Sequence, residues 1–371
     1  MIEKQCPEWK AANKHFVQNE STDRLKHYVS YMWKYFKDDK KNIGNPLVYA
    51  ATNGHVDFAE LLIETPIDFN ATDHEGCTAI DHACRNNQLG ILQLLIRHSE
   101  MKNINFELKG YNDWTSLHHA CIYASLDLIK LLIDHLKSVQ NNLFQLTNNG
   151  SNIFHLAVQN PNSNVPKYIY DQFKENIDIN SSINDGTNPL QLVCLNGNLE
   201  TLKFVLQQEP DLTAVNQYHN NYFHLAAMNP KTEVLQHLLN SYPTTLANVP
   251  GFNGRRYIHE AAHNGILGNV RLLHAHFGNE YFDEGDDNGN TPLHLASYKG
   301  HFKVVEFILK KSDPNTFNIN KKNHAGSTAE NFAKHKGHTS TSELLEIYRL
   351  ESRLKILKAK YNIESNNETL K

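Results

Sequence analysis

The sequence predicts an all-α solenoid of helix–turn–helix units, because three features recur along it at one period. Each unit has an opening residue, which is apolar in most units. This residue recurs at intervals of 33, 37, 37, 36, 33, 35, 35 and 37 residues. Prolines stand just before some of these positions, glycines follow many of them, and paired apolar residues come after. A period of this length is typical of repeat architectures. The nine positions, which number the repeats one to nine, are Leu47, Ile80, Leu117, Phe154, Leu190, Phe223, Ile258, Leu293 and Glu330.

The first helix of each unit is expected to begin beside a proline where one is present. Pro46, Pro189 and Pro292 fall in the first helical turn, where the missing N–H has no intrahelical partner to lose. The helix should then end at a glycine, because the chain reverses there and glycine tolerates positive φ. These glycines are Gly54, Gly197, Gly265, Gly300 and Gly337.

The second helix of each unit is expected to carry a pair of apolar residues toward the next unit. A single unit cannot bury this stripe, so the core must form by stacking of neighbours. The clearest pairs are Leu61–Leu62, Leu94–Leu95, Leu131–Leu132 and Leu238–Leu239.

Repeat eight reads NTPLHLASYKGHFKVVEFILKK over residues 290–311 and closely resembles the ankyrin repeat, whose usual length is about 33 residues. With its weaker copies, the resemblance spans residues 40–348. It implies an ankyrin-repeat α-solenoid in which β-hairpin-like loops join the helix pairs. Because terminal repeats of such arrays need polar outer faces, we expect helical caps at both ends.

The resemblance also implies a role for the histidine after the opening residue, which in this family bonds neighbouring backbone and ties successive turns together. This residue is His118, His155, His224, His259 or His294 in five repeats. Since the other repeats have Val48, Asp81, Gln191 and Asn331 there, the tie is expected to be intermittent.

Residues 259–263 read HEAAH and match the H-E-x-x-H pattern of zinc proteases. His259 and His263 would share one helical face, with Glu260 as general base. The glycine and third histidine of the extended motif are absent. The repeat register gives His259 the tying role and places Ala261–Ala262 at the pair of small residues between helices, so we interpret HEAAH as an ordinary first helix. Zinc hydrolysis is the alternative.

The cysteines are odd in number, sparse and without a CxxC pair, which favours a reducing compartment. They are Cys6, Cys77, Cys84, Cys121 and Cys194. Cys84, Cys121 and Cys194 share the second place of the small pair and are expected to be buried packing residues. The segment HHAC at 118–121 suggests a cysteine–histidine nucleophile, but the repeat accounts for both residue types. We therefore predict no catalytic residue, cofactor or metal ligand.

Charge and hydropathy exclude other classes of partner. The net charge of −4 gives no basic field for nucleic acid or an anionic membrane surface. No apolar run approaches the roughly 20 residues that span a bilayer, and the first residues lack the apolar core of a signal peptide. We expect a cytoplasmic protein that binds neither nucleic acid nor membrane.

Residues 1–39 do not repeat, whereas residues 40–341 form the predicted array. Two helices are expected at about 7–19 and 23–37. They are interpreted as a cap on the first repeat, with a docking segment as the alternative, because the second is rich in aromatic residues. Those residues are Tyr28, Tyr31, Trp33, Tyr35 and Phe36.

Residues 342–361 are predicted to be a C-terminal capping helix, and residues 362–371 a disordered tail. The helix carries a heptad seam of little more than two turns, shorter than the three to four heptads that indicate a coiled coil. We expect a monomer, with self-association through 347–361 as the alternative. The seam residues are Ile347, Leu350, Leu354, Leu357 and Tyr361.

The ankyrin resemblance implies a non-catalytic scaffold that grips a partner protein through its concave groove and hairpin tips. The alternative is a zinc- or cysteine-dependent hydrolase that uses the same groove. At the family's variable positions, aromatic, arginine and other residues suited to interface hot spots are expected to bind the partner. They are Tyr111, Trp114, Ile122, Tyr123, Tyr218, Met228, Phe252, Arg255, His263 and Tyr298.

Asparagine is abundant and lysine greatly outnumbers arginine, a composition typical of AT-rich genomes. Ankyrin arrays of bacteria with such genomes resemble secreted effectors that act on host proteins, although a eukaryotic microbe would have the same composition. An effector would work in the cytoplasm of its host.

Overall fold

The computed structural model describes residues 45–242, 249–279, 281–312 and 317–360. Within these ranges the chain forms 19 α-helices and two short 3-10 helices, without a strand. The predicted all-α class is therefore confirmed. The chain divides into two compact units at residues 174 and 175.

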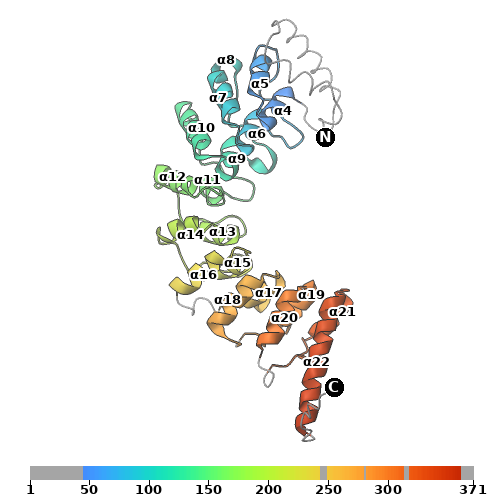
Figure 1. The fold of residues 1–371 in the computed structure, drawn as a ribbon. Helices are drawn as coiled ribbons and strands as arrows, with labels where there is room; N and C mark the ends of the chain where they lie inside the picture. The colour runs from blue at the N-terminus through green and yellow to red at the C-terminus, as the bar shows by residue number, and fades with distance from the viewer. Residues whose placement is uncertain (1–44, 243–248, 280, 313–316, 361–371) are drawn as a thin grey trace, which may run out of the picture. The chain divides into compact units, whose positions relative to one another are not determined.

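The first unit holds four helix pairs, each joined by a short turn or loop (Figure 1). Its first helices are α4 (Pro46–Asn53), α6 (Ala79–Arg85), α9 (Ser116–Tyr123) and α11 (Ile153–Ala157), and each contacts the next. Its second helices are α5 (Val56–Ile63), α7 (Leu89–Arg97), α10 (Leu126–Ser138) and α12 (Asn164–Phe173). The short helices α8 (Ser99–Lys102) and η1 (Tyr111–Asp113) lie in the connection between α7 and α9.

The second unit holds five helix pairs (Figure 1). Its first helices are α13 (Pro189–Asn196), α15 (Tyr222–Ala227), α17 (Tyr257–His263), α19 (Pro292–Lys299) and α21 (Ala329–His335). Its second helices are α14 (Leu199–Leu206), α16 (Thr232–Ser241), α18 (Leu267–Phe277), α20 (Phe302–Lys311) and α22 (Thr339–Lys360). The 3-10 helix η3 (Phe252–Gly254) precedes α17.

Helix ends follow the predicted pattern of prolines and glycines. Pro189 opens α13, where Asn188 caps the helix by accepting a hydrogen bond from the backbone N–H of Gln191. Gly197 ends the same helix with φ of 75°. A Cβ at that glycine would lie 2.6 Å from the Asn229 side chain, so both the backbone angle and the close approach require glycine.

The apolar pairs of the second helices form the core of each stack. Leu62, Leu95, Leu132 and Leu238 are fully buried, one from each predicted pair. Successive second helices contact one another; for example, α5 contacts α7, and α14 contacts α16. Stacking therefore removes from water the stripe that one repeat alone would expose.

The loops between repeats are hairpin-like turns whose tips are linked by single backbone hydrogen bonds. The N–H of Tyr111 donates to Glu75 at 2.8 Å, and that of Asp287 donates to Asn253 at 2.8 Å. One bond per tip is too few for a strand ladder, so the described loops contain no β-structure.

The side chain that follows the opening residue does bond neighbouring backbone, as predicted. This tie occurs in more repeats than the sequence predicts. Nε2 of His224 donates to the carbonyl of Arg255 at 3.0 Å, while its Nδ1 accepts from the N–H of Asn221. Gln191 does the same work in repeat five, since its side-chain nitrogen donates to the carbonyls of Ala214 and Asn220. The expectation that this repeat lacks the tie is wrong, because an amide also offers both a donor and an acceptor.

This equivalence predicts how position 224 responds to substitution. His224→Ala should lower the free energy of unfolding by about 2–4 kcal/mol, because a fully buried side chain and two hydrogen bonds are lost. His224→Gln should recover at least half of that loss by bonding as Gln191 does. Urea unfolding at pH 7 measures both, and equal destabilisation by the two variants would contradict the shared role.

The two ends differ in how much the structure describes. Residues 1–39, with their predicted cap or docking role, and the tail 362–371 lie outside the described residues. The first turns of α22 contact α20 and α21 and bury Leu345. The seam residues of α22 are 40–53% exposed, namely Ile347, Leu350, Leu354 and Leu357; Tyr361 lies beyond the described residues.

Candidate functional site

Repeats two and three form a pocket of about 500 Å³ in the first unit. It is bordered by three of the predicted partner-binding residues, Tyr111, Trp114 and Tyr123. The remaining lining residues, which the sequence did not single out as binding residues, are His74, Glu75, Cys77, Arg85, Asn112 and His119.

The aromatic wall of the pocket comes from the third repeat. Tyr111 is 72% exposed in η1, and Tyr123 is 49% exposed at the end of α9. Trp114 is half-buried, with its ring centroid 5.0 Å from that of His119. The loop comes close to repeat two, since a Cβ at Gly110 would lie 3.2 Å from Sγ of Cys77. Because both tyrosines are exposed, they can contact a partner. Trp114 instead packs on His119 and braces the loop.

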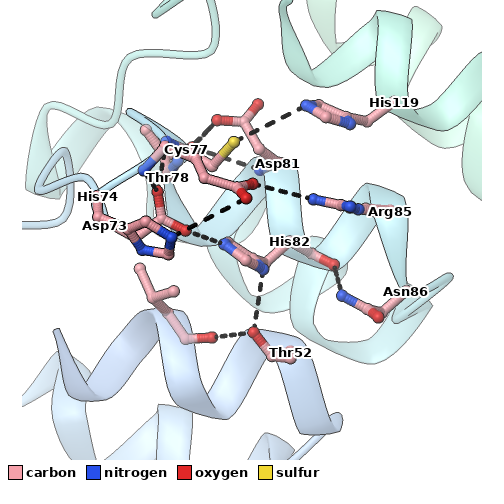
Figure 2. Close-up of polar contacts among 12 residues, drawn as sticks. Thr52, Asp73, His74, Cys77, Thr78, Asp81, His82, Arg85, Asn86 and His119 are labelled. Carbon is pink, nitrogen blue, oxygen red and sulfur yellow. Dashed lines mark hydrogen bonds and ion pairs between the residues drawn. The ribbon is translucent and has the colours of Figure 1, made fainter. Parts of the chain in front are cut away.

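The polar side of the pocket comes from the second repeat, shown in Figure 2. Asp73 accepts hydrogen bonds from the N–H groups of Glu75 and Cys77, both at 2.9 Å, and from Nε2 of His82 at 2.7 Å. Burial alone would raise the pKa of Asp73, but the bonds from His82 and the backbone hold it below its usual value. Asp73 is therefore an ionised residue that fixes the loop.

Asp81 and Arg85 are further ionisable residues on this side of the site. Burial raises the pKa of Asp81 to about 7, although Thr78 donates two hydrogen bonds to its carboxylate. Arg85 lies 3.2 Å from Glu75, and both side chains are nearly half-exposed. Such an exposed pair contributes about 1 kcal/mol or less, so either partner can exchange it for another group.

Cys77 and His119 face each other in the pocket, with Sγ 4.0 Å from Nε2. Burial, together with the carboxylates of Asp81, Asp73 and Glu75, raises the pKa of the Cys77 thiol to about 12. Burial also lowers the pKa of His119 to about 3. At neutral pH the pair is thus a thiol beside a neutral imidazole, which is the opposite of an activated cysteine nucleophile.

The HEAAH segment forms helix α17, as the repeat register predicts. Both nitrogens of His259 are used: Nδ1 accepts from the N–H of Arg256 at 3.2 Å, and Nε2 donates to the carbonyl of Glu284 at 3.0 Å. Glu260 is buried and lies 3.6 Å from Arg255. The interpretation as a first helix is confirmed by the bounds of α17, and both nitrogens of His259 serve the tie to neighbouring backbone.

The three cysteines of the small pair are completely buried. Cys84, Cys121 and Cys194 have no exposed surface, and burial raises the pKa of each thiol above its usual value. They are packing residues, as predicted. The HHAC nucleophile at 118–121 has no route to a substrate.

Of the other predicted partner-binding residues, Ile122 is partly exposed on α9 of the first unit, and Met228 is partly exposed at the C-cap of α15 in the second. Tyr218 and Phe252 are each 44% exposed and pack edge to face, with centroids 5.8 Å apart. Tyr298 is 37% exposed, with Nζ of Lys336 4.5 Å from the centre of its ring.

Two members of the predicted set are held by neighbours in the second unit. Arg255 lies between the buried carboxylates of Glu260, at 3.6 Å, and Asp286, at 3.5 Å. His263 is half-buried, and burial followed by the charge of Arg255 lowers its pKa to about 4. Arg255 is therefore less available for a partner than an exposed anchor would be.

Comparison with known proteins identifies the repeat. The family described as "Ankyrin repeats (3 copies)" matches residues 99–183, 168–248 and 223–323, and that described as "Ankyrin repeats (many copies)" matches residues 47–96. The chain belongs to the ankyrin-repeat family. Ankyrin repeats support a role in protein interaction. None of the helices that the structure describes has the length and apolar character needed to cross a membrane.

Several ankyrin-repeat relatives are larger proteins of different kinds. The chain is 27% identical over 202 residues to human transient receptor potential cation channel subfamily A member 1, covering 53% of this chain and 14% of the channel. It is 23% identical over 291 residues to NAD-dependent deacetylase sir2B of Dictyostelium discoideum, covering 71% and 32%. It is 28% identical over 148 residues to NF-kappa-B inhibitor cactus of Drosophila yakuba, covering 40% and 29%. The chain thus spans less than a third of each relative.

Proposed function

We propose that this chain is a non-catalytic scaffold that holds a partner protein at the pocket of its first unit and at exposed aromatic residues on its loops. One observation carries the proposal: a cavity of about 500 Å³ is bordered by Tyr111, Trp114 and Tyr123. Aromatic residues around a concave site are the usual anchors of protein interfaces, because they bury a large area at little entropic cost.

The exposure of the two tyrosines supports a protein ligand. Tyr111 and Tyr123 present apolar rings to water at 72% and 49% exposure in the lining of one cavity. A partner side chain that entered the cavity would cover both rings. Arg85 is beside them and holds Glu75 only through an exposed contact, so it is free to pair with an acidic group of the partner.

The test is a double variant, Tyr111→Ala with Tyr123→Ala, used as bait in a pull-down and then in a binding titration with the partner found. We expect affinity to fall by more than tenfold, since loss of one interface hot spot costs about 2 kcal/mol or more. Circular dichroism should be unchanged, because neither ring is buried. Met101→Ala is the matched control, as Met101 is 78% exposed in the same unit but outside the pocket. Equal capture by all three proteins would remove the tyrosines from the interface.

The same proposal covers the cellular location of the chain and its oligomeric state. We propose a monomer, because the exposed seam of α22 covers only about two heptads and a coiled coil needs three to four. The asparagine- and lysine-rich composition supports a secreted effector in a host cytoplasm. Host and non-host lysates used side by side in the pull-down test this setting.

A further inference from the structure

Two residues of the pocket, Cys77 and His119, differ from the residues that most other repeats have at the same places. Their side chains contact each other. The place of Cys77 is held by Ser151, Asn290 and Ser327 in other repeats, and the place of His119 by Leu156, Leu225 and Leu295, with a second histidine, His82, at this place in repeat two. The two positions are 42 residues apart in the chain, yet Sγ lies 4.0 Å from Nε2. Packing does not require either residue type, because serine, asparagine and leucine serve there elsewhere.

His119 is buried without the partners that a buried histidine normally has. It is 7% exposed, and within the described part of the chain its Nδ1 has no hydrogen-bond partner. Its neighbour His118 uses both nitrogens, at 3.0 Å from the N–H of Thr115 and 3.0 Å from the carbonyl of Gln145. Figure 2 shows the ring of His119 directed at the Cys77 sulfur. The nitrogen that faces the sulfur is Nε2, which makes it the one ring atom of His119 placed to share a ligand with Cys77.

Carboxylates complete the donor set. Ligand atoms of Asp73, Glu75 and Cys77 all lie within 4.8 Å of one another, and His119 adjoins this group through its contact with the Cys77 sulfur. Asp73 is fixed by His82 and by two backbone N–H groups. Glu75 is exposed and held only by surface contacts, so its carboxylate is free to turn toward the sulfur.

We propose that Cys77, His119 and Glu75 bind a divalent transition-metal ion of the zinc type, with a fourth position that faces the pocket. A thiol, an imidazole and a carboxylate together favour zinc over magnesium or calcium, which prefer oxygen ligands alone. With Zn–S near 2.3 Å and Zn–N near 2.0 Å, a tetrahedral ion separates sulfur and nitrogen by about 3.5 Å. The observed 4.0 Å needs only a small side-chain adjustment.

The charges around the sulfur favour a dication. The carboxylates of Asp73 and Glu75 lie close to the sulfur, because the ligand atoms of the three residues are within 4.8 Å of one another. An ion with two positive charges is attracted by these carboxylates and stabilises the thiolate directly. Binding converts Cys77–SH and M²⁺ into a Cys77–S–M⁺ unit and releases one proton.

Titration of the full chain with Co²⁺ tests the site, because a thiolate ligand produces a charge-transfer band in the near ultraviolet. We expect one equivalent to bind with this band. Cys77→Ser should remove the band, and His119→Leu should weaken binding at least tenfold. Both variants carry residues that other repeats hold at the same places, so the fold should survive. Cys194→Ala is the matched control, since alanine occupies that place in other repeats, and it should bind like the parent chain.

An unchanged band in Cys77→Ser, or no band in the parent chain, would overturn the proposal. If a variant fails to fold, alkylation of the parent chain by iodoacetamide decides instead. Zn²⁺ should slow modification of Cys77, located by mass spectrometry, and equal rates with and without Zn²⁺ would refute the site. The proposal does not depend on partner binding, because the Tyr111→Ala, Tyr123→Ala variant retains all three ligands and should bind Co²⁺ normally.

Discussion

Lowering the pH from 7 to 4 should destabilise the second unit by several kcal/mol. Burial lowers the pKa of His224 and of His259 from 6.5 to about 4. The unfolded chain therefore binds protons at these residues between pH 6.5 and 4 while the folded chain does not, so stability is full above pH 6.5 and falls toward pH 4. A shift of this size corresponds to about 3 kcal/mol for each histidine at pH 4.

Acidic residues of the same unit oppose this effect in part. Burial raises the pKa of Glu260 and of Asp283 despite the nearby Arg255 and Lys321, so these two carboxyl groups favour the folded state as the pH falls. His263 and His294 act in the same direction as His224 and His259, since burial lowers the pKa of each, so the two carboxyl groups reduce a loss to which all four histidines contribute. Urea unfolding of the full chain at several pH values measures it.

His224→Gln provides the control for this pH dependence. Glutamine keeps the tie, as Gln191 shows, but does not titrate. The variant should be slightly less stable than the parent chain at pH 7 and more stable at pH 4. If both proteins lose the same stability between these pH values, the buried histidine is not the group that titrates.

The sequence predicted the repeats and their helix ends because the interactions that set them are local. Pro189, Asn188 and Gly197 act within a few residues of their own helix, and each behaves as its residue type requires. The burial of the leucine pairs could also be predicted, since a stripe repeated at every unit can only be covered by the neighbouring unit.

The site was less predictable because its contacts join different repeats. Arg255 has an exposed-anchor pattern in sequence, but Asp286 lies 31 residues further along and pairs with it. The pairing of Cys77 with His119 spans 42 residues and gives no motif. No other repeat has a cysteine at the place of Cys77, so a comparison of the repeats would have marked this residue as an exception.

Phe223→Ala should lower the free energy of unfolding of its part of the array by about 3–5 kcal/mol, the usual cost of truncating a buried phenylalanine. Phe223 is fully buried, with its ring centroid 4.8 Å from that of Tyr222 and 6.0 Å from that of Tyr257. It therefore joins α15 to α17, and its loss leaves a cavity between two repeats.

The position of the damage matters as much as its size, because each repeat is stabilised only by its neighbours. Hydrogen exchange measured by mass spectrometry should show lost protection in α13, α15 and α17, with α4 and α6 in the first unit unchanged. Phe252→Ala is the matched control: the same residue type is 44% exposed in the same unit, so its truncation should change stability by about 0.5 kcal/mol or less. Loss of protection spread evenly over all described helices would mean that the chain unfolds as one cooperative body, and the repeats would then not be the units of its stability.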